Sequence, residues 1–495
     1  MRAAARSLIA SAGLLAACGG GGGEDVTGPA TDLPPDPAGS QAVASIVVTP
    51  AEDILIVGET VRLVAETRAE DGTVLTGRPV SWTSSDPDVA EVDPETGLVL
   101  AAGVGEATIT ATSEAVEGSA AVGVVAFRQV SAGSAHTCAV TTEGAAYCWG
   151  FNNFGQLGDG TTTDRIRPVL VADGLVFESV TGGAQHTCGL TLAGLAYCWG
   201  NNTRGQLGDG TNSHSTRPTA VAPTAQSLPL NFTSLSAGFA HTCGRTTTER
   251  GYCWGSNTAG QLGDGATTGR LVPTQVLTAI GFTFLELRAG GTHSCGIMSS
   301  GAAQCWGRNG NGQLGDGTTL DQRRAVAVVP PAGQSTPLAF ASLSLGGIHS
   351  CGLDQAGVIY CWGSNGSGEL GDGTTTSSTE PVPVEPPAGF TFAAVAAGSS
   401  HSCGLGPIGA AYCWGNNTQG QLGDGTTTNR PLPVAVAPPA EASRAPLFTS
   451  LSAGGNHTCG ITPLGRPYCW GDNANGQLGT GTTESSPVPV AVVSP

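Results

Sequence analysis

A motif with two cysteines ten residues apart recurs seven times between residues 138 and 469, and it restricts the fold of this chain more than any other feature. In the first copy, His136–Cys138 (His-Thr-Cys) is followed by Tyr147–Gly150 (Tyr-Cys-Trp-Gly) and then by Gly155–Thr161 (Gly-Gln-Leu-Gly-Asp-Gly-Thr). The first cysteine of each later copy lies 50, 55, 52, 56, 52 and 56 residues after the previous one. Seven units of similar length predict one repeat architecture rather than several unrelated domains.

Each unit contains four short β-like stretches, which in the first unit are Phe127–Ala132, Thr137–Val140, Ala145–Trp149 and Pro168–Val171. Four strands per repeat are typical of a propeller blade, and seven blades can close into a ring that leaves no long edge exposed. An open solenoid is the alternative, but it would need polar caps at its ends, and the last unit ends in an apolar segment. We therefore predict an all-β chain with a seven-bladed β-propeller over residues 126–495.

The recurrent motifs Ala-Gly-x-x-His, Trp-Gly-x-Asn and Gly-Gln-Leu-Gly resemble those of the regulator-of-chromosome-condensation repeat family, whose fold is a seven-bladed propeller. The resemblance extends over about three quarters of the chain. It implies the fold strongly and the function weakly, because a nuclear guanine-nucleotide exchange factor and a secreted bacterial β-lactamase inhibitor share this architecture.

Residues 43–125 precede the repeats and contain short alternating stretches, such as Ser45–Thr49 and Thr60–Ala65, that stop at turn residues. This spacing predicts a small antiparallel β-sandwich. The segment resembles the bacterial immunoglobulin-like group 2 domain in the motifs Val48–Pro50, Val57–Thr60, Trp82–Asp86, Thr96–Val99 and Gly105–Ile109. The resemblance implies a spacer or adhesion module without catalysis, with independent ligand binding as the alternative, and it places Trp82 in the core.

The first residues have the features of an export signal. Arg2 and Arg6 precede a mostly apolar stretch, Ser7–Ala17, which is too short to span a bilayer. The stretch ends in Leu15–Cys18 (Leu-Ala-Ala-Cys), which resembles the lipobox of bacterial lipoproteins. We predict a lipoprotein signal peptide over residues 1–17, with an ordinary signal peptide as the alternative.

The lipobox resemblance implies that Cys18 receives a lipid and becomes the mature N-terminus. Gly19 follows it rather than Asp, which by the enterobacterial sorting rule favours the outer membrane. Residues 18–42 are rich in Gly, Pro, Asp and Thr and are expected to form a flexible tether. The folded part is therefore expected to be extracytoplasmic, anchored to the membrane through this lipid and exposed at the outer membrane or cell surface.

Fourteen of the fifteen cysteines belong to the repeats. A hairpin centred on Glu143 places Cys138 opposite Cys148, with Cβ atoms about 4.5–5.5 Å apart, and a disulfide needs only about 3.5–4.5 Å. The alternative is a metal site made by His136, Cys138 and Cys148, but it lacks a fourth ligand, and an oxidising compartment removes the thiolates. We predict seven disulfides and no metal, with the pairs Cys138–Cys148, Cys188–Cys198, Cys243–Cys253, Cys295–Cys305, Cys351–Cys361, Cys403–Cys413 and Cys459–Cys469.

Residues that occur once per unit are interpreted as architecture. A catalytic histidine is needed once, so a histidine in every unit is better explained by turns or inter-blade hydrogen bonds. The tryptophans fit packing, with sugar stacking as the alternative, and Asp159 is expected to order a Gly-rich turn rather than bind phosphate or calcium. The two series are His136, His186, His241, His293, His349, His401 and His457, and Trp149, Trp199, Trp254, Trp306, Trp362, Trp414 and Trp470.

Recognition is expected where the units differ, because loops on a rigid scaffold commonly carry binding sites. The arginines at 165, 167, 323 and 324 are candidates for acidic partners, with ordinary solvated charge as the alternative. The variable stretches are Asp164–Arg167, His214–Arg217, Pro223–Leu230, Asp321–Arg324, Pro330–Pro337 and Pro438–Pro446.

The chain has a net charge of −18 and contains no lysine. Nucleic-acid binding normally needs a basic stripe, so we predict no nucleic-acid partner. We predict a lipid-anchored propeller that binds an extracytoplasmic protein or glycan, with no catalytic residues and no cofactor. The alternatives are guanine-nucleotide exchange by family analogy, and an enzyme site at the propeller channel, where Asp354 or Glu369 would need a second carboxylate.

Overall fold

The computed structural model describes residues 41–224, 230–278, 283–440 and 442–495, and almost all of its regular elements are strands. The helical content of these residues is a single 3-10 turn, η1 (Ala172–Gly174). None of the described residues belongs to a helix that is long and apolar enough to cross a membrane.

Part of the sequence-based interpretation falls on residues that are not described. The predicted signal peptide (residues 1–17), the lipid-bearing Cys18 and residues 18–40 of the predicted tether lie outside the described residues. These features remain predictions.

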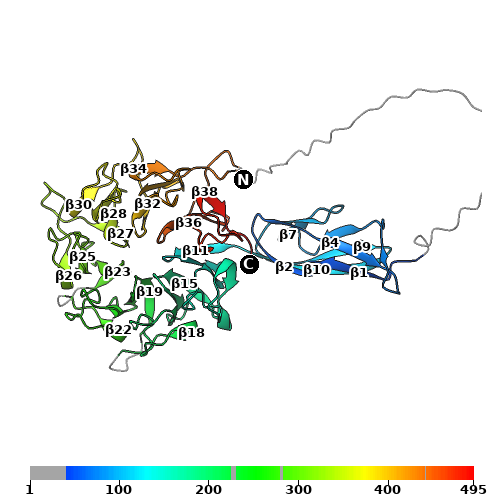
Figure 1. The fold of residues 1–495 in the computed structure, drawn as a ribbon, viewed down its shortest axis with the longest axis horizontal. Coiled ribbons are helices and arrows are strands. Elements are labelled where there is room, and N and C mark those ends of the chain that lie inside the picture. The colour runs from blue at the N-terminus through cyan, green and yellow to red at the C-terminus, as the bar shows by residue number, and fades with distance from the viewer. Residues whose placement is uncertain (1–40, 225–229, 279–282, 441) are drawn as a thin grey trace, which may run out of the picture.

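Seven four-stranded antiparallel sheets form the blades of a closed ring, which confirms the predicted propeller (Figure 1). In every blade the strand order in space follows the sequence, and the first strand lies innermost. The first strands are β11 (Phe127–Ala132), β15 (Phe177–Gly182), β19 (Phe232–Ala237), β23 (Phe284–Ala289), β27 (Phe340–Leu345), β31 (Ala394–Ala397) and β35 (Ser450–Ala453). The second strands are β12 (His136–Thr141), β16 (His186–Thr191), β20 (His241–Thr246), β24 (His293–Met298), β28 (His349–Asp354), β32 (His401–Leu405) and β36 (His457–Ile461).

The outer half of each blade is equally regular. The third strands are β13 (Ala146–Gly150), β17 (Ala196–Gly200), β21 (Gly251–Gly255), β25 (Ala303–Gly307), β29 (Ile359–Gly363), β33 (Ala411–Gly415) and β37 (Pro467–Gly471). The fourth strands, at the rim, are β14 (Arg165–Leu170), β18 (Ser215–Ala220), β22 (Arg270–Gln275), β26 (Gln322–Ala327), β30 (Ser378–Pro383), β34 (Arg430–Ala435) and β38 (Ser486–Ala491).

The hydrophobic core lies between blades rather than inside one blade. Cys138 and Cys148 of blade 1 pack with Phe177 and Trp199 of blade 2 in one buried cluster, and equivalent clusters fill the other junctions. The Phe177 and Trp199 rings have centroids 5.7 Å apart. Because each blade supplies half of two clusters, no blade can bury its apolar residues alone, which explains why the repeats must assemble as a ring.

The ring closes without sharing a strand between its ends. Blade 1 consists of β11 to β14 and blade 7 of β35 to β38. At the junction between them Trp149 Nε1 donates to the Gln477 carbonyl at 2.9 Å, as the equivalent tryptophans do at the other six junctions. The Ala132 N–H also donates to Ser452 Oγ at 2.9 Å. Side-chain hydrogen bonds therefore join the first and last blades.

The two faces of the disc carry different connections. The repeat face, as we name it, carries the turns between the first and second strands and the Gly-Gln-Leu-Gly loops between the third and fourth strands. The variable face carries the hairpins between the second and third strands and the connections that lead from one blade to the next.

The N-terminal domain has three small sheets, with the orders β1-β4-β5, β2-β10-β9-β6 and β3-β8-β7. Its strands are β1 (Ser45–Thr49), β2 (Glu52–Ile56), β3 (Thr60–Arg62), β4 (Val64–Arg68), β5 (Val74–Leu75), β6 (Ser81–Ser84), β7 (Ala90–Val92), β8 (Leu98–Ala101), β9 (Gly105–Ser113) and β10 (Val116–Val125). Trp82 is buried in its core, as predicted. The predicted strand Thr60–Ala65 is instead divided at Leu63, because the Leu63 N–H donates to Gly97 and the chain then passes to another sheet.

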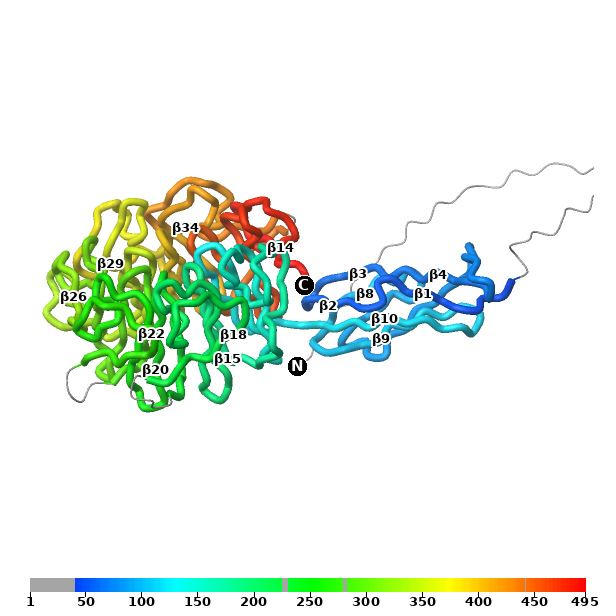
Figure 2. Tube along the Cα trace, turned by 60° about the horizontal axis from the view of Figure 1, so that its bottom comes forward, coloured from blue at the N-terminus to red at the C-terminus, as the bar shows by residue number. Residues whose placement is uncertain are grey.

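This domain projects from the rim of the propeller (Figure 2). Ile56, at the end of β2, is fully buried in the cluster that joins blades 1 and 7, beside Phe127 and Ile461. Arg466 of blade 7 also donates from Nη1 to the Gly58 carbonyl at 3.4 Å. The N-terminal domain thus contacts the propeller at the junction where the ring closes.

Candidate functional site

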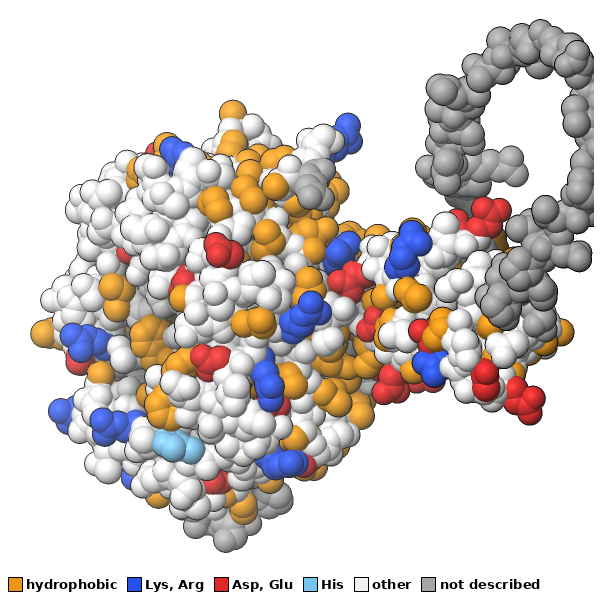
Figure 3. All heavy atoms as spheres, turned by 45° about the vertical axis from the view of Figure 1, so that its right-hand side comes forward, with side chains coloured by type: hydrophobic (Ala, Val, Ile, Leu, Met, Phe, Trp, Pro, Cys, Tyr) orange, Lys and Arg blue, Asp and Glu red, His pale blue; other side chains and the backbone are white. Residues whose placement is uncertain are grey.

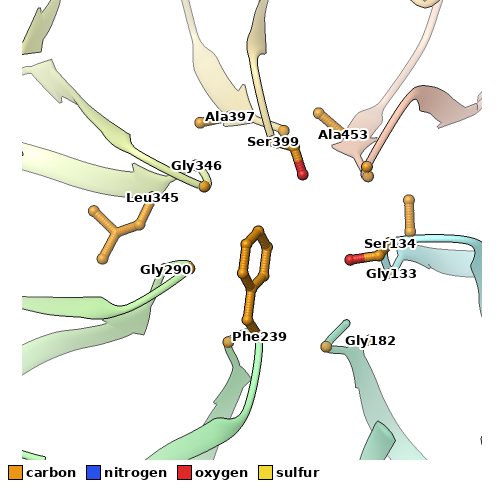
Figure 4. Close-up of a pocket in the computed structure, with 18 of the residues that line it drawn as sticks. Gly133, Ser134, Gly182, Phe239, Gly290, Leu345, Gly346, Ala397, Ser399 and Ala453 are labelled. Atoms are coloured by element: carbon orange, nitrogen blue, oxygen red, sulfur yellow. The ribbon is translucent and has the colours of Figure 1, made fainter. Parts of the chain in front are cut away.

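A narrow throat lies on the propeller axis, at the repeat-face end of the innermost strands (Figure 4). Seven equivalent turns meet there, and a backbone N–H of each donates to a glycine carbonyl of the next blade. The seven bonds run from Ser134 to Gly183 (3.2 Å), Ala184 to Gly238 (3.2 Å), Phe239 to Gly291 (3.3 Å), Gly291 to Gly346 (3.0 Å), Gly347 to Gly398 (3.2 Å), Ser399 to Gly454 (2.9 Å) and Gly455 to Gly133 (3.1 Å). Glycine is required because a Cβ on Gly133 would lie 2.6 Å from the Gly183 oxygen.

One aromatic side chain lies in the throat. Six of the seven turns carry Ser, Ala or Gly at the position where blade 3 carries Phe239. The Phe239 ring lies in the middle of the opening (Figure 4), and a Cβ on Gly347 of blade 5 would lie 3.3 Å from its Cζ atom. The Phe239 ring therefore narrows the channel at the repeat face.

All seven motif histidines are fully buried, and each contacts a hydroxyl of the next blade. The Nε2–Oγ pairs are His136–Thr187 (2.9 Å), His186–Thr242 (2.9 Å), His241–Ser294 (3.0 Å), His293–Ser350 (2.8 Å), His349–Ser402 (2.8 Å), His401–Thr458 (2.9 Å) and His457–Thr137 (2.9 Å). The predicted role in inter-blade hydrogen bonding is confirmed.

The hydrogen-bond network fixes the protonation of these rings. Thr187 Oγ1 donates to the Gln156 carbonyl at 2.8 Å, so it can only accept from His136, whose Nε2 must carry the proton. Trp199 Nε1 donates to the same carbonyl at 3.0 Å. Nδ1 of each motif histidine is left without a partner among the described residues. Burial lowers the pKa of the seven rings to about 3 or about 4, so they are neutral at pH 7.

The fourteen repeat cysteines form the seven predicted disulfides, each joining the second and third strands of one blade. All fourteen are fully buried. The seven tryptophans are also fully buried, which confirms packing and leaves no face for sugar stacking. Among the described residues, no three His, Cys, Asp or Glu side chains lie close enough to hold a metal ion.

Asp159 orders its turn, as predicted. Its Oδ1 accepts from the Thr161 N–H at 3.0 Å, and its Oδ2 accepts from Arg165 Nε at 2.9 Å. These donors outweigh burial and lower the pKa of Asp159. The same turn recurs at Asp264 and Asp424, so this carboxylate belongs to the scaffold.

The two carboxylates considered for an enzyme site do not meet at the channel. Asp354 Oδ1 accepts from the Ala356 and Val358 N–H groups in a hairpin turn. Glu369 lies in the repeat-face loop of blade 5, where burial raises its pKa. Neither residue is among those that line the throat or the channel above it.

Between the throat and the variable face the innermost strands line a wider cavity, which we call the funnel. Its wall consists mainly of small, hydroxyl and aliphatic residues, and three charged residues, Arg128, Glu178 and Arg288, interrupt it. Arg128 is held at the wall because its Nη2 donates to the Phe177 carbonyl at 2.7 Å. The funnel is the largest concave feature on the propeller axis, and it opens among the loops of the variable face.

The hairpin tips around this opening expose large apolar side chains. Ile408 is 77% exposed, Leu192 is 73% exposed and Leu464 is 71% exposed, and all three lie in turns between second and third strands. Figure 3 shows hydrophobic side chains gathered on the propeller beside the N-terminal domain. Large apolar side chains that are exposed on one face are typical of interaction sites.

The predicted variable stretches divide between the two faces. Three of them, Asp164–Arg167, His214–Arg217 and Asp321–Arg324, lead into fourth strands from the repeat face. The described parts of the other three, Pro223–Leu230, Pro330–Pro337 and Pro438–Pro446, lie on the variable face. Residues 225–229 and 441 of these stretches lie outside the described residues.

The four candidate arginines do not form one acidic-partner site. Arg165 pairs with Asp159 in blade 1, and Arg167 packs against Gly481 of blade 7. Arg323 and Arg324 belong to β26 of blade 4. The four arginines therefore lie on blades 1 and 4, and their role towards acidic partners stays a prediction.

Sequence reasoning missed Phe239 and Arg288. Each residue stands at a repeat position where most units carry a small or hydroxyl-bearing side chain. This single difference from the other units was the signal in the sequence that could have identified them. Its meaning depends on knowing that the two positions face the channel.

Comparisons with known proteins agree with both domains. The model of the bacterial Ig-like domain (group 2) matches residues 42–124. The model of the regulator of chromosome condensation (RCC1) repeat matches residues 143–190, 193–244, 250–297, 356–405, 409–461 and 465–495, and a second model of this repeat matches further segments from residue 127 onward.

Similar curated proteins include the ultraviolet-B receptor UVR8 of Arabidopsis thaliana, 31% identical over 49% of this chain and 54% of that protein. The probable E3 ubiquitin-protein ligase HERC4 of Homo sapiens is 36% identical over 62% of this chain and 29% of that protein. The chain thus spans about half or less of the length of these relatives.

Solved structures show the same fold. Human WBSCR16 has a TM-score of 0.63 at 19% identity, covering 71% of this chain and 95% of that one. Yeast RCC1 (Prp20), bound to Kap60, has a TM-score of 0.61 at 22% identity, covering 70% and 83%. A further structure of Prp20p from Saccharomyces cerevisiae, with a TM-score of 0.60 at 22% identity over 74% and 87%, was described together with its binding to Gsp1p and histones.

Proposed function

The chain belongs to the regulator of chromosome condensation (RCC1) repeat family, and from this premise we propose that it is an extracytoplasmic scaffold whose variable face binds a protein or glycan. The observation that carries the proposal is the set of exposed apolar tips, Leu192, Ile408 and Leu464, around the open end of the funnel. Large apolar side chains held on rigid hairpins supply contact area at little cost in conformational entropy.

The location is supported by the disulfides. Seven buried disulfides indicate an oxidising compartment outside the cytoplasm. The finer part of the proposal is a lipid on Cys18 that anchors the protein to the outer membrane or cell surface, and its support is the lipobox-like Leu15–Cys18 and the following Gly19. The Ig-like domain then serves as the spacer between membrane and propeller.

A binding role is favoured over a catalytic one. The recurrent histidines make hydrogen bonds between blades, and the recurrent cysteines form disulfides within blades. The carboxylates of Asp354 and Glu369 lie apart from the funnel. Two solved structures of this fold are named for proteins that they bind, Kap60 in one case and Gsp1p and histones in the other. These names support a protein as the ligand class here.

Proximity labelling on intact cells that express the full chain tests this proposal. The variant combines Leu192→Ser, Ile408→Ser and Leu464→Ser, and we expect it to lose the labelled partners while the protein stays folded. The matched control is Leu320→Ser, because Leu320 is 69% exposed but lies in a loop of the repeat face. Retention of every labelled partner by the triple variant, or an equal loss in the control, would count against recognition by the variable face.

A further inference from the structure

The channel-side edges of the innermost strands are covered by side chains of neighbouring blades. An uncovered strand edge leaves backbone groups unpaired, so proteins usually protect it. In five blades a hydroxyl accepts a hydrogen bond from the edge N–H of the next blade. The donors and acceptors are Gly182 N and Ser131 Oγ (2.9 Å), Ala237 N and Thr181 Oγ1 (3.1 Å), Ala289 N and Ser236 Oγ (3.0 Å), Ala397 N and Ser344 Oγ (2.9 Å), and Ala132 N and Ser452 Oγ (2.9 Å).

These five hydroxyls keep their own protons available. Each accepts one N–H, and none donates to a protein acceptor in the hydrogen bonds of the described residues. All five belong to the residues that line the funnel. The funnel wall therefore presents a ring of O–H donors.

Two blades break this ring. Blade 4 carries Arg288 and blade 6 carries Ala396 where the other blades carry Ser or Thr. The N–H groups that these residues would cap belong to Leu345 and Ala453, which pair with the second strand in the same register as Ala132. Within the described chain, no side chain accepts a hydrogen bond from these two N–H groups, and both residues line the funnel, so they add two donors to its wall.

Arg288 is held in a fixed orientation. Its Nε donates to Glu286 Oε1 at 2.8 Å, and Glu286 Oε2 accepts from the Leu343 N–H of blade 5 at 2.8 Å. The Arg288 side chain is 44% exposed and lines the funnel, and its Nη1 makes no hydrogen bond to another described residue. Glu286 acts here as a positioning residue that anchors one side of the guanidinium and leaves the other side free.

The shape and charge of the funnel limit the ligand. Phe239 narrows the far end, so the wide entrance for a group is the one at the variable face. O–H, N–H and guanidinium donors together suit an oxyanion. The Arg288 charge is shared with Glu286, which favours a singly charged group over a doubly charged phosphate.

We propose that the funnel binds a ligand carboxylate between Arg288 and the uncapped N–H of Leu345, with the ring hydroxyls as further donors. The inference rests on the proposed binding function and names the chemical group that the variable face admits. The carboxylate belongs either to a peptide terminus or acidic side chain, or to the uronic acid of a glycan, and the probes below separate these sources.

Titration of the purified full-length protein with four probes tests the assignment. The probes are N-acetyl-alanyl-alanine, its C-terminal amide, glucuronate and glucose, and binding is followed by isothermal titration and ligand-observed NMR. We expect a carboxylate probe to bind and its neutral counterpart not to bind. The acid that binds more tightly identifies the source as peptide or glycan.

Arg288→Ser is the decisive variant, because it restores the hydroxyl that five other blades carry and so keeps the blade junction intact. We expect it to weaken carboxylate binding by about tenfold or more, the scale of a charge-assisted hydrogen bond, without lowering the melting temperature. Ala396→Ser caps the Ala453 N–H and is expected to weaken binding less. The matched control is Arg323→Ser, an exposed arginine of β26 outside the funnel, which should bind as the wild type does.

Equal binding of the acid and its amide would overturn the proposal, as would undiminished binding by Arg288→Ser or an equal loss in Arg323→Ser. Failure here is distinguishable from failure of the proposed function. If proximity labelling still depends on the apolar tips but no carboxylate probe binds, the variable face is a binding surface and the funnel inference alone is wrong.

Discussion

On the repeat face, residues such as His136 and Trp199 are fully buried and bonded across a blade junction, whereas on the variable face Leu192 and Ile408 are exposed in the hairpins between second and third strands. Both faces are built from one repeat, so the difference does not come from the strands. It comes from what each turn must satisfy. The repeat-face loops supply a carbonyl that accepts from buried side chains of the next blade. The variable-face turns contact the next blade through the backbone, as in the bond from the Phe177 N–H to the Gly144 carbonyl at 2.9 Å, and this leaves side chains such as that of Leu192 exposed.

This contrast explains where the sequence is free to change. A change at the Gln156 loop alters the partners of Thr187 and Trp199 in the next blade. A change at a hairpin tip such as Leu464 alters the surface and leaves the junctions intact. Stability and recognition are thus separated within each repeat, and the predictions that follow test this separation.

Acidification is expected to break the repeat face most strongly. The pKa of the seven buried histidines lies at about 3 or about 4 in the folded protein, below the ordinary value of 6.5. The unfolded chain therefore binds protons first, and the stability present above pH 6.5 is lost as the pH falls towards those lower values. The contribution of each histidine to the free energy of unfolding falls by about 2 kcal/mol between about pH 7 and pH 5. The urea concentration at the midpoint of unfolding should therefore fall steeply in this range.

One substitution makes the assignment specific. His136→Gln replaces a histidine that binds a proton on unfolding by a residue that does not titrate. The number of protons taken up on unfolding near pH 5 should therefore decrease by about one. The number is obtained from the slope of the unfolding free energy against pH. A stability that does not change between pH 7 and pH 5 would show that the histidines are not buried as neutral rings.

Removal of one junction tryptophan is the next largest effect. Trp199→Ala leaves a cavity between blades 1 and 2 and removes one donor from the Gln156 carbonyl. We expect a loss of about 3–5 kcal/mol in the free energy of unfolding, measured with guanidinium chloride. Leu192→Ala on the variable face is the matched control and should stay within about 0.5 kcal/mol of the wild type. If both variants lost a similar amount of unfolding free energy, the two faces would not differ in their contribution to stability.

The fold was predictable because its determinants recur. Cys138 and Cys148 predicted their own disulfide from the symmetry of a hairpin around Glu143, and seven copies made the pattern unambiguous. The division of Thr60–Ala65 between two sheets was not predictable, because its cause is a bond from Leu63 to the distant Gly97. Alternation in the sequence reports which side of a strand is buried and says nothing about which sheet the strand joins.

The candidate site was less predictable because it is made of exceptions. Phe239 and Arg288 each occur once, at positions that the repeats otherwise reserve for small or hydroxyl side chains. Their significance arises from the ring, which brings the seven turns of the throat together around one axis. The spacing of repeated motifs identifies the residues that all blades share. The character of the central channel instead depends on the few residues that differ from blade to blade.

Glu369 is an exception on the repeat face itself, and it gives the smallest expected effect. Six blades carry Gln at this position, and the Glu369 carboxylate keeps one of its hydrogen bonds by accepting from the Ser367 N–H at 2.8 Å. Burial raises the pKa of Glu369 above its ordinary value of 4.5, so ionisation at neutral pH works against folding. We expect Glu369→Gln to raise the free energy of unfolding at pH 8 by roughly 1 kcal/mol, the scale of one buried hydrogen bond, as measured by urea denaturation.

This effect should disappear at low pH, and the reverse substitution in another blade should have the opposite sign. The unfolded chain loses its proton near pH 4.5 and the folded chain at a higher pH, so the advantage of Glu369→Gln should decrease as the pH falls below the folded value and vanish below about pH 4.5. Blade 3 provides the reciprocal variant, because Gln261 Nε2 donates to Ser256 Oγ at 3.4 Å and Ser364 occupies the equivalent place beside Glu369. Gln261→Glu should therefore lower stability at pH 8. If both substitutions were neutral, the repeat face would tolerate charge as readily as the variable face does, and the contrast between them would rest on the histidines and tryptophans alone.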